Sequence, residues 1–120
     1  MRYMMLIYSG EDDAAAPDDM RAVAEAHRSF MEEARRLGIL VAGDPLQTSA
    51  TATVVRVEQS KTLVTDGPYA ETKEQLAGYY ILDCRDLDEA LAWAAKIPTG
   101  CAGAAGCVEV RPLREIPRNG

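Results

Sequence analysis

The only histidine of the chain, His27, is the side chain best suited to move a proton near neutral pH. An imidazole has a pKa of about 6.5, so it can serve as a general acid or base wherever a pocket gives a ligand access to it. The same residue falls in the middle of an apolar helix stripe. A core histidine satisfied by one hydrogen bond is therefore the alternative interpretation, and both stay open at this stage.

A second group of polar side chains lies in residues 66–74, Asp-Gly-Pro-Tyr-Ala-Glu-Thr-Lys-Glu. Gly67 can adopt a positive φ and Pro68 fixes its own φ, so the segment predicts a stiff turn. Asp66 would orient His27 or act as a base, and Lys73 would bind an anionic group of a substrate. The candidate polar rim consists of Asp66, Tyr69, Glu71, Lys73 and Glu74. Its alternative is a turn capped by Asp66, with solvated charges beyond it.

Metal and cofactor motifs are not found in the sequence. Five residues separate Cys101 from Cys107, whereas structural zinc sites usually show about two to four. No Gly-rich phosphate loop and no Gly-x-Ser-x-Gly motif occurs, so we expect neither a metal nor a nucleotide cofactor. Trp93 and its aromatic neighbours Tyr79 and Tyr80 are expected to pack in the core.

A long helix must position His27. Pro17 is typical of a first helical turn, and Gly38 is typical of the residue just past a helix end, which predicts a helix over residues 17–37. Apolar residues recur along it at spacings of three and four, as on one face of a helix. This stripe contains Met20, Val23, Ala24, His27, Phe30, Met31, Ala34 and Leu37.

Strands must form the floor beneath that helix. Residues 2–8 and 78–84 are apolar at both odd and even positions, a pattern typical of strands buried on both faces. A second helix is predicted from an N-cap at Asp86 to about residue 97, because Asp86 and Glu89 have capping-box spacing and Pro98 follows. The other predicted strands are 39–42, a hairpin of 53–58 with 62–65, and 108–111.

This order of elements predicts an α+β fold, a ferredoxin-like split βαβ sandwich with an inserted β-hairpin. Two helices can cover only one face of a sheet, yet two of the predicted strands are apolar on both faces. The cheapest cover for the second face is another copy of the chain. We therefore expect a homodimer that packs sheet to sheet.

Composition limits the classes of protein. The 120 residues suit a single domain over residues 1–120 with a polar tail at 112–120. A net charge of −6 with scattered Lys and Arg makes a nucleic-acid or anionic-membrane surface unexpected. No apolar run approaches the roughly 18 residues of a membrane span. An odd number of cysteines, three, fits a reducing cytoplasm.

The sequence resembles the YCII-related family, in particular its DGPF (DGPFAETKE) branch. The resemblance rests on Asp-Gly-Pro-Tyr-Ala-Glu-Thr-Lys-Glu at 66–74 and extends to Arg-Tyr-Met-Met-Leu-Ile-Tyr at 2–8 and Ala-Gly-Asp-Pro-Leu at 42–46. It implies a dimeric α+β barrel of ferredoxin-like protomers. It also implies a family whose members include small enzymes with a His–Asp dyad and proteins that accompany or are fused to extracytoplasmic-function sigma factors. His27 matches the helix histidine of the family.

Two departures affect the site. The Asp-Pro that the family carries after its second helix is Ile97-Pro98 here, so Asp66 or Asp44 would have to replace the missing acid, or no dyad exists. The Phe of the motif is Tyr69, which adds a hydroxyl group. Asp44 thus joins Tyr69, Glu71 and Lys73 as a candidate substrate-binding residue.

Three functions follow as hypotheses. The first is a dimer that binds a small molecule and acts as a proton-transfer or hydrolytic enzyme through His27 and Asp66. The second is a non-catalytic accessory module linked to sigma factors. The third, by analogy of fold, is a cofactor-free oxygenase or isomerase.

Overall fold

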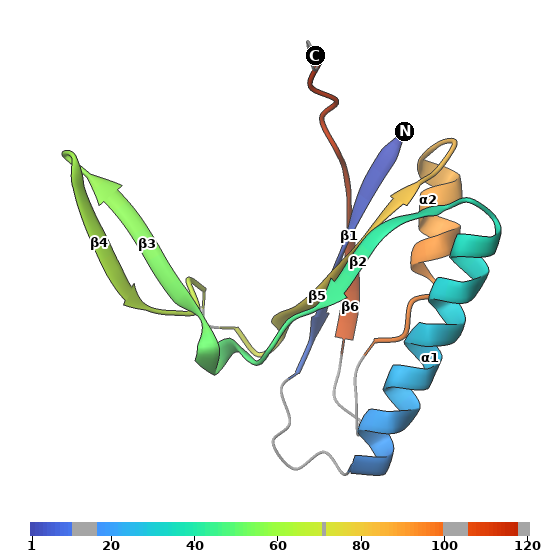
Figure 1. Cartoon of the computed structure of the whole chain (residues 1–120), viewed down its shortest axis with the longest axis horizontal. Coiled ribbons are helices and arrows are strands. Elements are labelled where there is room, and N and C mark those ends of the chain that lie inside the picture. The colour runs from blue at the N-terminus through green and yellow to red at the C-terminus, as the bar shows by residue number, and fades with distance from the viewer. Residues whose placement is uncertain (11–16, 71, 100–105, 118–120) are drawn as a thin grey trace.

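The computed structural model describes residues 1–10, 17–70, 72–99 and 106–117 (Figure 1). The helices α1 (Pro17–Arg36) and α2 (Leu87–Ala94) cover the same face of a four-stranded antiparallel sheet. Its strands are β2 (Leu40–Pro45), β5 (Gln75–Asp83), β1 (Arg2–Ser9) and β6 (Gly106–Pro112), in this spatial order. A 3-10 turn, η1 (Ser49–Thr51), leads into a separate hairpin of β3 (Thr53–Glu58) and β4 (Lys61–Asp66). The predicted α+β fold is confirmed.

Several element boundaries differ from the predictions; among them, β5 and β6 begin three and two residues earlier than expected. β2 does not end at residue 42, because Gly43 and Asp44 continue the ladder opposite Tyr80 and Tyr79. α2 ends at Ala94 rather than near residue 97, and the chain leaves it through a tighter turn in which the Ile97 N–H donates to the Ala94 carbonyl at 3.1 Å. The hairpin turn contains two residues instead of three, since Lys61 pairs with Glu58.

The helix ends follow the local signals of the sequence. Gly38 has a φ of +73°, a conformation that glycine adopts without steric cost, and it terminates α1. At the start of α2 the Asp86 carboxylate accepts the Glu89 N–H at 2.9 Å. The Glu89 side chain reaches back to the Arg85 N–H at 2.9 Å, one residue before the N-cap.

The core lies between the helices and the sheet. Phe30 of α1 joins its two sides, because its ring lies 4.9 Å from that of Tyr80 and 6.0 Å from that of Trp93. The buried core residues are Tyr3, Met5, Ile7, Phe30, Ala34, Tyr80, Leu82, Cys84, Ala90, Trp93 and Ile97. Burial of Trp93 and Tyr80 confirms that both pack in the core, whereas the same prediction is wrong for Tyr79, which is half-buried on the other face of the sheet.

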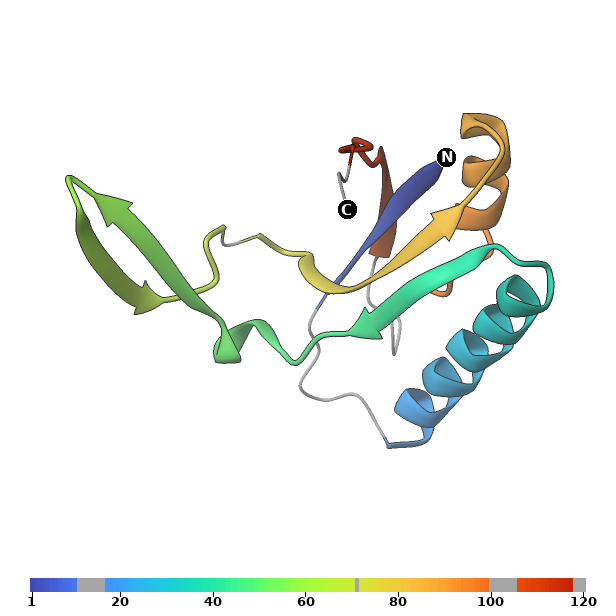
Figure 2. The same cartoon turned by 45° about the horizontal axis from the view of Figure 1, so that its top comes forward.

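Neither described helix covers the opposite face of the sheet. Met4 and Leu6 of β1 lie there beside Ile81 and Tyr79 of β5, and all four side chains are half-buried. The sequence predicted burial on both faces, but both helices lie on the other side (Figures 1 and 2). Among the described residues, this apolar face therefore has no second layer.

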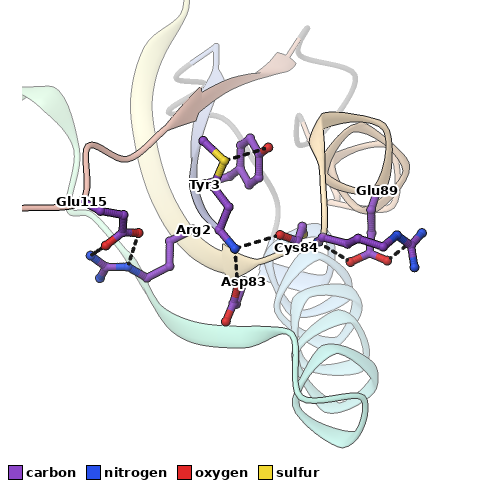
Figure 3. A network of polar contacts seen from close by, with 8 residues as sticks. Arg2, Tyr3, Asp83, Cys84, Glu89 and Glu115 are labelled. Atoms are coloured by element: carbon purple, nitrogen blue, oxygen red, sulfur yellow. Dashed lines mark hydrogen bonds and ion pairs between the residues drawn. The ribbon is translucent and has the colours of Figure 1, made fainter.

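The two ends of the described chain are held to this sheet by surface contacts (Figure 3). The α-amino group of Met1 donates to the Asp83 carboxylate at 3.0 Å. The Arg2 guanidinium contacts the Glu115 carboxylate at 3.2 Å, and that hydrogen bond lowers the pKa of Glu115. Neither described helix is long and apolar enough to cross a lipid bilayer.

Candidate functional site

A cavity of about 410 Å³ lies between the N-terminal half of α1 and the sheet. Helix α1 contributes five of the eight residues of its apolar stripe, Met20, Val23, Ala24, His27 and Met31. The sheet contributes the end of β1 and the paired segments of β2 and β5. A volume of this size falls within the range of about 300–1,000 Å³ that is typical of small-molecule sites.

His27 forms a hydrogen bond inside this cavity with a residue of the sheet. Its Nδ1 lies 2.7 Å from the hydroxyl oxygen of Tyr80 on β5. A tyrosine hydroxyl can donate or accept, so this contact supports either neutral tautomer of the imidazole. In both tautomers the second ring nitrogen, Nε2, is left to meet a ligand.

Both members of the pair are neutral at physiological pH. Burial lowers the pKa of His27 below its ordinary value of 6.5, because the imidazolium loses solvation. Burial likewise raises the pKa of Tyr80 above 10.0. A neutral imidazole is the form that a general base requires, and a neutral phenol is a hydrogen-bond donor.

A second tyrosine forms a matching pair at the edge of the sheet. The Tyr79 hydroxyl donates to Asp44 Oδ2 at 2.8 Å, and this hydrogen bond raises the pKa of Tyr79. Tyr79 and Asp44 face each other across β5 and β2, and both residues border the cavity, but their paired side chains lie on the face of the sheet away from α1. Because side chains alternate along a strand, consecutive tyrosines of β5 send their hydroxyls to opposite faces of the sheet.

Glycine is required where β2 passes the Tyr80 ring. A Cβ atom at Gly43 would overlap Cδ1 of that ring, so any larger residue would displace Tyr80. Gly78, one strand away, leaves only 2.9 Å between its hypothetical Cβ and the Asp44 carbonyl oxygen. These glycines let β2 approach β5 closely enough to close the floor of the cavity.

The lining is mainly apolar and carries little charge. Of the described residues that line it, Asp44 is the one acidic residue, and none is a lysine or arginine. The Asp44 carboxylate is bonded to Tyr79 on the other face of the sheet, so the polar side chains on the α1 side are Ser9, His27 and Tyr80. Such a surface suits an uncharged, mainly apolar ligand with one or two hydrogen-bonding groups.

The predicted rim residues are distributed differently from the sequence-based expectation. Asp66 ends the hairpin strand β4 and is not among the residues that line the cavity. Tyr69 is 77% exposed and lies beneath the Arg56 guanidinium, 5.1 Å from ring centroid to Cζ. Lys73 is exposed, and Glu71 lies outside the described residues. The hydrogen-bond partner of His27 is thus Tyr80, and Asp44 alone of the predicted acids borders the same cavity.

Glu74, the last member of the predicted rim, contacts the strand on the far side of the sheet. Its carboxylate lies 3.6 Å from the Cys107 thiol of β6. Burial, followed by the nearby Glu74 charge, raises the pKa of that thiol. Cys101, the other cysteine weighed as a metal ligand, lies outside the described residues, as does the rest of the 100–105 segment.

A sequence model described as the YCII-related domain matches residues 1–117. The chain belongs to the YCII-related family. It is 40% identical over 119 residues to an uncharacterised protein of Rhizobium meliloti (strain 1021), an alignment that covers 94% of this chain and 92% of that protein. The family assignment made from the 66–74 motif is therefore confirmed.

In this YCII-related protein Ile97 and Pro98 follow α2, where the family resemblance implies an Asp-Pro. Ile97 is buried in the core at 5% exposure, and Pro98 borders the cavity. Pro98 lines the same cavity as His27, and Ile97 supplies no carboxylate there. Sequence reasoning missed Tyr80 as the partner of His27. Its signal was available, since a tyrosine on the buried face of a strand needs a hydrogen-bond partner for its hydroxyl.

Proposed function

We propose that this YCII-related protein binds a small, uncharged, mainly apolar molecule in the cavity beneath α1, and that His27 exchanges a proton with it. The observation that carries the proposal is the 2.7 Å contact between His27 Nδ1 and the Tyr80 hydroxyl at the wall of a cavity of about 410 Å³. Tyr80 holds the ring through Nδ1, which leaves Nε2 as the atom that meets the ligand. A ligand carbonyl or hydroxyl is the group that this nitrogen would recognise.

The chemistry follows from the neutral state of the imidazole. With its proton on Nδ1, donated to Tyr80, the ring accepts a ligand proton at Nε2 as a general base. The imidazolium so formed loses solvation in the cavity, so it returns the proton readily to another atom of the same ligand. Tautomerisation or isomerisation of a carbonyl compound is the reaction class that such a return describes. Hydrolysis would require the same nitrogen to activate a water molecule.

Two copies of the chain complete the proposed functional unit. The half-buried apolar face formed by Met4, Leu6, Tyr79 and Ile81 has no second layer within one chain. We propose that the same face of another copy covers it. Light scattering at micromolar concentration should give the mass of a dimer, and a monomer there would refute this part of the proposal.

The cavity is tested by a ligand screen. Small uncharged ketones, lactones and phenols are screened against the protein by saturation-transfer NMR. A Trp at position 24 would fill the cavity, since Ala24 borders it on α1. The matched control is Ala26→Trp, because Ala26 is an exposed alanine of the same helix that does not border the cavity. We expect A24W to weaken binding of a detected fragment at least tenfold and A26W less than threefold. Equal effects of the two variants would locate binding elsewhere.

A further inference from the structure

The hairpin of β3 and β4 projects from the body of the protein as an arm (Figures 1 and 2). It forms a sheet of its own, which is not hydrogen bonded to the four-stranded sheet. The radius of gyration is 16.4 Å, whereas a compact domain of this length has about 14 Å. Two-stranded hairpins are at best marginally stable alone in water, so a surface that packs on the arm is expected.

The strand register divides the arm into two unlike faces. Residues directly opposite each other in an antiparallel pair share a face, so Val55 and Val64 lie together with Val57 two residues along. These three valines are 61%, 62% and 69% exposed. The other face is mixed, since Val54 and Leu63 share it with Arg56, Glu58 and Lys61. One face of the arm is therefore an apolar surface in contact with solvent, which we call the valine face.

The position of the arm points to what covers it. In both views the arm and the helices lie on opposite sides of the sheet, so the arm stands beside the space in front of the bare sheet face (Figures 1 and 2). A partner seated on that face therefore meets the arm as well. In a twofold dimer each copy presents the same sheet face and the same arm to the other. Each copy would therefore cover both the bare sheet face and the arm of its partner.

Charges on the bare face allow two copies to meet. Arg2 contacts Glu115, and Arg111 Nε lies 3.8 Å from Glu109, so opposite charges at its margin are already paired within one chain. Apart from the Asp44 carboxylate, which accepts the Tyr79 hydroxyl, these charges do not oppose the approach of two such faces. We propose that the arm packs against a second copy of this chain and that the valine face is buried in this contact. The proposal rests on the sheet-to-sheet dimer proposed above and adds the arm as a second part of its interface.

Contacts at the base of the arm fix the orientation of the arm. The Gly67 N–H donates to the Ala52 carbonyl at 2.8 Å, and a Cβ at Gly67 would lie 2.9 Å from that of Ala52. Beyond the Gly67–Pro68 bond, the Gln75 amide donates to the Thr72 carbonyl at 3.0 Å, which closes the loop on itself. The described residues of the 66–74 motif thus lie at the junction of arm and body, and we assign them the role of orienting the arm toward the partner.

Two neighbouring substitutions on opposite faces of the arm test the proposal. Val64→Glu places a charge on the valine face, and Leu63→Glu places the same charge on the other face, where Leu63 is 43% exposed. Dimer dissociation constants are measured by sedimentation velocity over a concentration series, with circular dichroism to verify folding. We expect V64E to raise the dissociation constant at least tenfold and L63E to change it less than threefold.

The outcomes separate this proposal from the one on which it rests. A wild-type protein that is monomeric at 100 µM, as a sample concentration, overturns both. A stable dimer that V64E and L63E leave equally tight overturns the role of the arm alone and retains the sheet interface. Hydrogen exchange on the unaltered protein gives an independent check, since the amides of residues 53–66 should exchange more slowly on dimerisation. If these amides exchange at an unchanged rate in a proven dimer, the proposed burial of the arm is also refuted.

Discussion

The Tyr80 hydroxyl and His27 Nδ1 lie 2.7 Å apart, and this hydrogen bond joins strand β5 to helix α1 at the wall of the cavity. Its neighbour Tyr79 forms the corresponding bond to Asp44 at 2.8 Å on the edge of the same sheet. Two consecutive tyrosines therefore serve different partners. Tyr80 fixes the orientation of the one histidine beneath α1, and Tyr79 fixes the Asp44 carboxylate on the opposite face of the sheet.

The two tyrosines provide a matched pair of substitutions. Tyr80→Phe removes the hydroxyl from a buried site and leaves Nδ1 of His27 without its partner. We expect a loss of about 1 kcal/mol in the free energy of unfolding, measured by urea denaturation. Tyr79→Phe should cost clearly less, because the Asp44 carboxylate is exposed and water can replace the hydroxyl. Equal losses in the two variants would contradict the buried character of the His27–Tyr80 bond.

The pH dependence of stability follows from the lowered pKa of His27. Between its folded pKa and about 6.5 the unfolded chain binds a proton that the folded chain does not, so folding stability falls as pH falls through this window. Above about pH 6.5 the residue makes no such contribution. The His27→Gln variant lacks this proton linkage. Urea titrations at pH 7.5 and at pH 5, as assay conditions, should show that wild type loses more free energy of unfolding over this interval than H27Q does.

A glycine substitution tests whether β2 determines the position of Tyr80. Gly43→Ala introduces a Cβ that overlaps the Tyr80 ring, and overpacking of this kind costs about 1–3 kcal/mol. We also expect the NMR signals of the His27 ring to move, because its partner is displaced. Gly38→Ala is the control. It also costs about 1–2 kcal/mol, through the strain of a positive φ, but it has open space around it and should leave the His27 signals in place.

The cap of α2 gives a prediction that is independent of the cavity. Asp86→Ala removes the side chain that accepts the Glu89 N–H, and loss of an N-cap costs about 1 kcal/mol. Asp88→Ala, in the first turn of the same helix, removes an acid that is not the cap. The thermal midpoint should fall more for D86A than for D88A. A larger fall of the thermal midpoint for D88A than for D86A would contradict Asp86 as the N-cap of α2.

Local signals predicted most of the fold. The 3.6-residue stripe of α1, Gly38 at its end and the Asp86 cap each depend on chain neighbours alone, and the structure contains all three. The end of β2 was missed, because Gly43-Asp44-Pro45 has the composition of a turn. Its strand conformation depends on pairing with Tyr79 and Tyr80, which lie more than thirty residues later.

The candidate site was predicted only in part. His27 was identified from its type, and Asp44 was included as a replacement acid. The partner of His27 depends on which β5 side chain lies beneath α1, and the order of residues does not specify that relation. Asp66 of the 66–74 loop was predicted to orient His27 because the family resemblance implies a His–Asp dyad and the usual acid is replaced by Ile97-Pro98. The structure instead puts that loop at the root of the arm.

The measurement that tests the central proposal most directly is a ¹H–¹⁵N NMR titration of the His27 ring nitrogens, with and without an uncharged carbonyl fragment taken from the screen. The proposal predicts a ring pKa below 6.5 and a saturable change in the Nε2 signal on fragment binding. It also predicts that the Ala24→Trp variant loses this change and the Ala26→Trp variant retains it. A ring pKa of 6.5 or higher, together with an Nε2 signal that no fragment of the screen moves, would contradict it.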